Sequence, residues 1–166
     1  MAMPNPISAG GIGPSLVAGV LAGQNAVKAI ANKDVSIKGL WQYNLDFNEK
    51  YGYKTAGLEV FRIYLQSLNN DVLNYGMKNF LSTEEAEKLS YGLIPELHLA
   101  TKFMMVLKGA TNINAFRNLK YAVDKMRILN AIYKEYPKTI DNFSAWRGRV
   151  SKELEEVKGR FKPNPI

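Results

Sequence analysis

The sequence predicts an all-α protein, an irregular helical bundle preceded by a glycine-rich loop. Apolar residues recur at spacings of three and four in the C-terminal part, which is the period of an amphipathic helix. No window shows the sustained alternation of a half-buried strand, and proline, glycine and capping residues separate the helical stretches. With 166 residues, 46% of them hydrophobic, the chain can bury one modest core.

The N-terminal segment is an uncharged, glycine-rich loop that leads directly into a helix predicted over residues 14–31. Its sequence is Asn5-Pro6-Ile7-Ser8-Ala9-Gly10-Gly11-Ile12-Gly13, and Pro14 suits the start of a helix because its missing N–H needs no partner there. The amides of a first helical turn have no intrahelical acceptor and carry partial positive charge. The pattern therefore predicts either a main-chain binding site for a planar or anionic ligand, or simply a flexible entry turn.

The middle of the chain predicts a long second helix and several short ones. Asp34 or Ser36 can cap a helix that reaches about Leu68 and bends near Gly52. In the first helix, Ser15, Gly19 and Gly23 form a stripe of small residues that would let another backbone pack closely. Further short elements are expected over residues 70–80, from the capping box at 82–85, and over 95–108.

The last two helices have the clearest amphipathic patterns. Pro137 ends the first of them, so the two are predicted to form a hairpin around that residue. Glu156 and Arg160 have the spacing of an intrahelical ion pair. The predicted core positions are Phe116, Leu119, Val123, Met126, Leu129 and Ile132 in one helix, and Phe143, Trp146, Val150, Leu154, Val157 and Phe161 in the other.

The loop and the segments that follow it resemble the geranylgeranyl reductases of archaea, which are flavoenzymes that use FAD. The small-residue helix continues the likeness, although Ala9 stands where that family usually has the first of three glycines. Further matching segments are Leu40-Trp41-Gln42-Tyr43-Asn44, Tyr51-Gly52-Tyr53-Lys54, Val60-Phe61-Arg62 and Leu73-Asn74-Tyr75-Gly76.

The resemblance implies that this chain is the C-terminal portion of such an enzyme. Residues 1–33 would be the last piece of the FAD-binding domain, and residues 34–166 a helical C-terminal domain. Gly10, Gly11 and Ile12 would contact the flavin by main-chain atoms, and the substrate would be an isoprenoid membrane phospholipid whose double bonds are reduced. The strand and Gly-x-Gly-x-x-Gly turn of a dinucleotide-binding half are missing from the sequence. We therefore expect the chain to need that half, or a separate subunit, and to be inactive alone.

Few residues have a pattern that indicates catalysis. His98 is the single histidine and there is no cysteine, so we expect no catalytic residue and no metal site in this chain. Lys54 lies in the Tyr-Gly-Tyr-Lys match and is the candidate contact for the phosphate of the phospholipid; the alternative is a solvated basic edge. Without the missing part of the enzyme, the first predicted helix would expose its small, apolar face, so we also expect the chain to self-associate.

The net charge of +7 belongs entirely to residues 100–166. This distribution indicates either a solvated, salt-bridged helix surface or an autonomous basic module that binds a membrane surface or nucleic acid. The flavoenzyme interpretation expects no nucleic acid. It predicts a cytoplasmic protein that can lie against the membrane.

Overall fold

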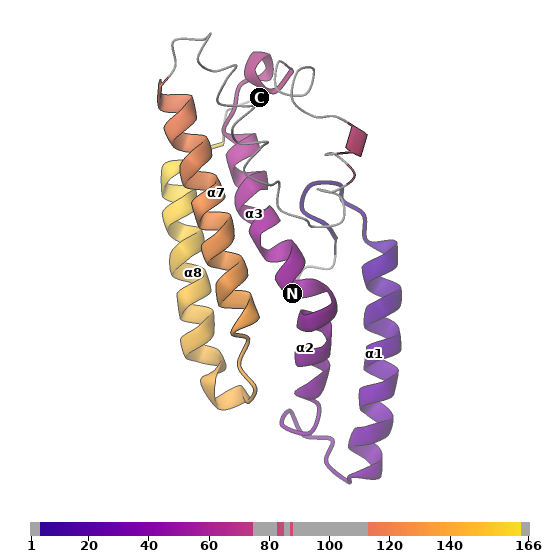
Figure 1. The fold of residues 1–166 in the computed structure, drawn as a ribbon. Helices are drawn as coiled ribbons and strands as arrows, with labels where there is room; N and C mark the ends of the chain where they lie inside the picture. The colour runs from indigo at the N-terminus through magenta and orange to yellow at the C-terminus, as the bar shows by residue number, and fades with distance from the viewer. Residues whose placement is uncertain (1–3, 75–82, 85–86, 88–112, 164–166) are drawn as a thin grey trace.

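The described part of the chain is mainly helical, as the sequence predicts, and has no strand (Figure 1). The computed structural model describes residues 4–74, 83–84, 87 and 113–163, with the backbone alone for 113–116. The element predicted over 95–108, most of the turn predicted over 70–80, and His98 lie outside the described residues. Of the capping box at 82–85, residues 83 and 84 are described, and both are helical.

The first helix, α1 (Ile12–Ala31), begins two residues before the predicted start. Pro14 lies in its first turn, where its missing N–H removes no helical hydrogen bond. The helix ends where Lys33 adopts the left-handed region, with a φ of 54°. There the amides of Lys33 and Asp34 donate to the carbonyls of Ile30 and Ala29, at 3.0 and 2.9 Å. This closing pattern satisfies carbonyls that the helix end would otherwise expose.

The second predicted helix exists, but it begins at Gln42 and not at Asp34 or Ser36. The Asp34 side chain accepts a hydrogen bond from the Ser36 amide at 3.0 Å, and the Ser36 hydroxyl accepts one from the Gly39 amide at 3.4 Å. These side chains therefore fold a turn instead of capping a helix. A Cβ on Gly39 would lie 2.0 Å from the Asp34 carbonyl oxygen, so this turn requires glycine.

A continuous helical rod runs from Gln42 to Gln66, in three parts. These are α2 (Gln42–Phe47), a π-helical segment (Asn48–Gly52) and α3 (Tyr53–Gln66). The π-helical segment coincides with the bend predicted near Gly52. Such a segment inserts an extra residue into the helical repeat and so changes the face that each end presents. Accordingly α2 packs against α1, whereas α3 packs against α7 (Ile113–Lys134) and α8 (Phe143–Arg160).

The predicted C-terminal hairpin is present: α7 and α8 pack together, joined through Pro137 and a short 3-10 turn (Ile140–Asn142) (Figure 1). The predicted core positions described by the structure are buried or pack against the core, while the side chain of Phe116 lies outside the described residues. The main core has residues from α3, α7 and α8, namely Leu58, Val60, Ile63, Tyr64, Leu119, Ala122, Met126, Leu129, Ile132, Trp146, Val150, Val157 and Phe161, with Ala56.

Two indole N–H groups fix the hairpin end of the molecule. Trp146 donates to the Ile132 carbonyl at 2.8 Å within the hairpin. Trp41, just before α2, donates to the Pro137 carbonyl at 2.9 Å and so ties the long rod to the hairpin turn. Both bonds are buried, and each satisfies a donor that would otherwise be costly to bury.

The helix α1 forms a separate small core with α2. Ala18 and Leu21 of α1 pack there with Phe47, and Tyr43 and Tyr51 cover this cluster. A Cβ added to Gly19 or Gly23 would meet no atom within 4 Å, so these two glycines of the small-residue stripe face open space in the described part of the chain.

Candidate functional site

The glycine-rich loop is organised by Asn5, which is 4% exposed. Its side-chain oxygen accepts hydrogen bonds from the amides of Ile7 and Ser8, at 2.8 and 3.1 Å. Its own amide donates to the Gly10 carbonyl at 3.0 Å, and its carbonyl accepts from the Ala9 amide at 2.9 Å. One buried side chain thus folds the loop into a defined turn at the start of α1.

Ala9 adopts a φ of 56°, in the left-handed region. An L-residue with a Cβ adopts this conformation at a cost of roughly 1–2 kcal/mol, which glycine avoids. The loop therefore places alanine at a position where glycine would adopt the same conformation without this cost.

The three residues predicted to contact a flavin lie together at the opening of α1. Gly10 is exposed, Gly11 is the N-cap residue, and Ile12 is 81% exposed. No side-chain hydrogen bond caps the helix at Gly11. A Cβ added to Gly13 would meet nothing within 4 Å. The side chains of Pro4 and Ser8 lie closer: a Cβ added to Gly11 would meet Pro4 at 3.8 Å, and one added to Gly10 would meet the Ser8 hydroxyl at 3.3 Å, so these two residues line part of the opening.

The apolar surface of α1 extends from this opening along the helix. Leu16, Val17 and Val20 are exposed, and α1 carries no charged side chain before Lys28. Isolated exposed apolar residues are normal on protein surfaces, whereas a contiguous set is typical of an interface. The surface therefore suits contact with another polypeptide or another apolar phase.

Lys54 is exposed in the first turn of α3, and its Nζ lies 5.8 Å from the ring centroid of Tyr53. The structure brings a second lysine to the same ring. The Nζ of Lys134, at the C-terminal end of α7, lies 5.9 Å from the Tyr53 centroid. The two ammonium groups therefore cannot be further apart than about twice that distance. In the described part of the chain neither lysine forms an ion pair.

Sequence reasoning missed Lys134. A lysine in the last turn of a helix is common, because a cation is favourable near a helix C-terminus. The sequence around Lys134 therefore does not mark it as a functional residue. Its position beside Lys54 results from the packing of α3 on α7, which joins residues far apart in the chain.

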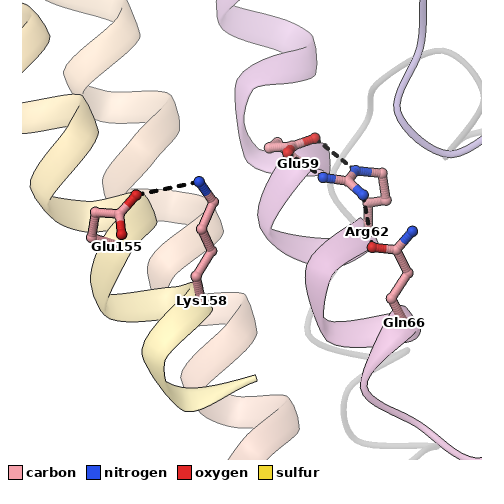
Figure 2. Close-up of polar contacts among 5 residues, drawn as sticks. All are labelled: Glu59, Arg62, Gln66, Glu155 and Lys158. Atoms are coloured by element: carbon pink, nitrogen blue, oxygen red, sulfur yellow. Dashed lines mark hydrogen bonds and ion pairs between the residues drawn. The ribbon is translucent and has the colours of Figure 1, made fainter. Parts of the chain in front are cut away.

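Arg62, on the same helix as Lys54, is engaged in local contacts. Its guanidinium donates two hydrogen bonds to Glu59, and a third to the Gln66 side chain at 2.7 Å (Figure 2). The hydrogen bonds to Glu59 raise the pKa of Arg62. Arg62 is therefore part of a surface network and does not extend the pair of lysines.

Some of the basic side chains in the described C-terminal part of the chain are paired with acidic residues. Lys125 contacts both Glu153 and Glu156, and Arg149 contacts Glu135 at 2.8 Å. Figure 2 shows a further pair, in which Lys158 contacts Glu155 at 3.3 Å. These pairs agree with one of the two interpretations of the basic C-terminal part, a salt-bridged helix surface.

The ion pair expected between Glu156 and Arg160 is not formed. Glu156 turns instead to Lys125 of α7. Arg160 lies over the ring of Tyr121, with its Cζ 4.3 Å from the centroid, and donates to the Asn118 side chain. Contacts between α7 and α8 thus replace the contact within α8, because the two helices lie side by side.

Two negative findings concern the described residues alone. They contain no group of three or more acidic, histidine or cysteine side chains that could hold a metal ion. None of the helices described combines the length and the apolar composition needed to cross a membrane.

Comparison with known proteins finds a relationship between this chain and part of a larger enzyme. No protein-family model matches the sequence. The chain is, however, homologous to part of a larger enzyme, the digeranylgeranylglycerophospholipid reductase of Sulfolobus acidocaldarius. The two are 34% identical over 154 residues, which is 92% of this chain and 34% of that reductase. The chain is therefore related to the geranylgeranyl reductases, and it spans about a third of the length of this relative.

Proposed function

We propose that this chain is the helical C-terminal part of a geranylgeranyl reductase-like flavoenzyme that reduces isoprenoid double bonds of membrane phospholipids. The homology to a reductase of digeranylgeranylglycerophospholipid supports the reaction class and the substrate class. The related reductases depend on FAD. The observation that carries a flavin role is the pre-folded loop of Asn5, which leaves the opening of α1 exposed.

The residues at this opening fit a flavin. Gly10 and Gly11 carry no side chain that would hold a planar ring away from the main chain. The amides of the first turn of α1 carry partial positive charge, which would favour negative charge on the pyrimidine edge of the reduced ring. FAD, when bound, supplies the hydride chemistry, and the protein contributes position and electrostatics. In this proposal residues 1–33 complete the FAD-binding domain and residues 34–166 form the helical domain.

The remaining part of the enzyme, or a separate subunit, would cover the exposed face of α1 near Leu16 and Val20. Lys54 would contact the lipid phosphate, and Lys134, whose Nζ lies near the same Tyr53 ring, is a second candidate for that contact. Two flexible ammonium groups without acidic partners in the described part of the chain are suited to a phosphate group.

The test is recovery of flavin binding when the chain is mixed with the polypeptide that corresponds to the rest of the relative. We expect flavin absorbance to co-purify with the mixture and not with this chain alone. Gly11→Val should weaken flavin binding roughly tenfold or more, because its side chain would project toward the ring. At Gly11 a Cβ meets Pro4 at an ordinary 3.8 Å, so the variant should still fold.

Gly148→Val is the matched control, since a Cβ there meets nothing within 4 Å and α8 is remote in sequence from the loop. Equal flavin affinity for Gly11→Val and Gly148→Val would refute the flavin site. Salt-sensitive binding of nucleic acid without any dependence on flavin would instead favour the autonomous basic module.

A further inference from the structure

The turn between α1 and α2 forms a tip on which apolar side chains are unusually exposed. We define the α1–α2 tip as residues 27–40. Five large apolar side chains in it are between 39% and 68% exposed: Val27, Ile30, Val35, Ile37 and Leu40. Hydrogen bonds within the tip already fix its backbone. Binding through these side chains therefore would not require the backbone to become ordered first.

The same tip is basic. Lys28, Lys33 and Lys38 are all exposed, whereas Asp34 is the one acidic residue of the tip and accepts a hydrogen bond from the Ser36 amide. The bond from Trp41 to Pro137 also brings the hairpin turn, with exposed Lys138 next in sequence, to the base of the tip. Exposed apolar side chains among lysines are the composition of a surface that enters the interfacial region of an anionic bilayer.

The tip lies at the opposite end of α1 from the glycine-rich loop (Figure 1). The 20 residues of α1 separate the two ends by about 30 Å. A polypeptide that completes a flavin site at the opening of α1 can therefore bind there while the tip stays accessible. A cluster of lysines also opposes contact between two copies of the tip, because like charges would face one another.

We propose that the α1–α2 tip docks on the surface of an anionic phospholipid bilayer, with its apolar side chains among the acyl chains and its lysines on the headgroups. The inference rests on the proposed function, since a phospholipid substrate resides in a bilayer. It adds the surface by which the enzyme reaches that substrate. This mode of contact needs no membrane-spanning helix.

The experiment is co-sedimentation of the full 166-residue chain with vesicles of phosphatidylcholine and phosphatidylglycerol, and with phosphatidylcholine vesicles alone. We expect stronger partitioning into the anionic vesicles. The double variant Ile30→Ser/Ile37→Ser should lower the partition coefficient about tenfold, because it removes apolar insertion without changing charge. Ile128→Ser, at a 41% exposed isoleucine of α7, is its control and should change partitioning little.

A second pair of variants separates the tip from the general basicity of the chain. Lys33→Gln/Lys38→Gln and Lys120→Gln/Lys152→Gln remove the same charge from exposed positions, the latter on α7 and α8. The tip variant should lose roughly thirtyfold in partitioning, since each of its two lysines near an anionic surface contributes about 1 kcal/mol. The control should lose much less.

Three outcomes would overturn the proposal. One is unchanged partitioning of the tip variants, and another is an equal loss in tip and control variants. The third is loss of self-association, or of assembly with the rest of the enzyme, while vesicle binding stays intact. Failure to recover flavin binding would refute the proposed function separately, because the vesicle measurement contains no flavin and no second polypeptide.

Discussion

The amide of Gly57 donates a hydrogen bond to the side-chain oxygen of Asn130 at 2.6 Å, across the contact between α3 and α7. A Cβ at Gly57 would lie 2.7 Å from that oxygen and 3.0 Å from the main-chain oxygen of Met126. The side chain of Asn130 could move aside, but the carbonyl of Met126 belongs to the α7 backbone. The missing side chain at Gly57 therefore sets how closely the two helices approach.

Gly57→Ala should destabilise the protein by about 1–3 kcal/mol, because the new methyl group forces α3 and α7 apart. The measurement is the free energy of unfolding from urea denaturation. Gly148→Ala is the control: it has open space and lies inside α8, so it should stabilise the protein by about 0.5–1 kcal/mol. Stabilisation by both substitutions would show that the close approach at Gly57 is not required.

Ala9→Gly should raise the free energy of unfolding by up to about 1 kcal/mol. The substitution removes the strain of a left-handed alanine, partly offset by the greater entropy of glycine in the unfolded chain. Ala9→Val should lower stability, since a branched side chain tolerates this conformation least. Thermal unfolding of the three proteins checks the order Gly, Ala, Val; a reversed order would mean that the loop has a different backbone conformation.

Lys54→Ala should weaken phospholipid affinity of the reconstituted enzyme roughly tenfold, the effect of losing one charged hydrogen bond. Lys134→Ala should weaken it comparably, because both ammonium groups lie near the ring of Tyr53. Lys120→Ala, at an exposed position earlier in α7, is the control. Unchanged affinity in Lys54→Ala would exclude this lysine from the phosphate contact.

Stability should fall in acid partly through Asp46. Partial burial alone would raise its pKa, but hydrogen bonds from Asn25 and Gln42, with nearby Lys28 and Lys50, lower the pKa below the ordinary value of 3.8. Because the unfolded state then binds the proton more readily, the stabilisation is present above pH 3.8 and is lost as pH falls through the folded-state pKa.

Asp46→Asn should therefore show a smaller loss of unfolding free energy between pH 5 and pH 3 than the wild type, in urea titrations at about these two values. Asp141→Asn, in the exposed turn before α8, is the control and should keep the wild-type acid dependence. If Asp46→Asn lost as much unfolding free energy in acid as the wild type, Asp46 would not contribute to the acid sensitivity.

The sequence predicts those parts of the fold that local patterns determine. The hairpin around Pro137 and the core positions of α7 and α8 follow from apolar periodicity, and Gly52 marks the interruption of the long rod. One failure concerns a contact between distant segments. Glu156 pairs with Lys125 and not with Arg160, because a neighbouring helix offers a closer cation than the next turn does.

The same limit applies to the candidate site. The loop and Lys54 are visible in the sequence, whereas the approach of Lys134 to Tyr53 depends on tertiary packing. The start of the second helix was misplaced because Asp34 and Ser36, both good capping residues, use their side chains inside a turn.

The π-helical segment makes the number of residues between Trp41 and Tyr53 as important as their identity. Each residue added to or removed from a helix rotates everything beyond it by about 100°. A one-residue deletion here would turn Phe47 away from α1 or Leu58 away from α7, since a single rod must satisfy both partners. Within this stretch the chain should accept many substitutions but few changes of length.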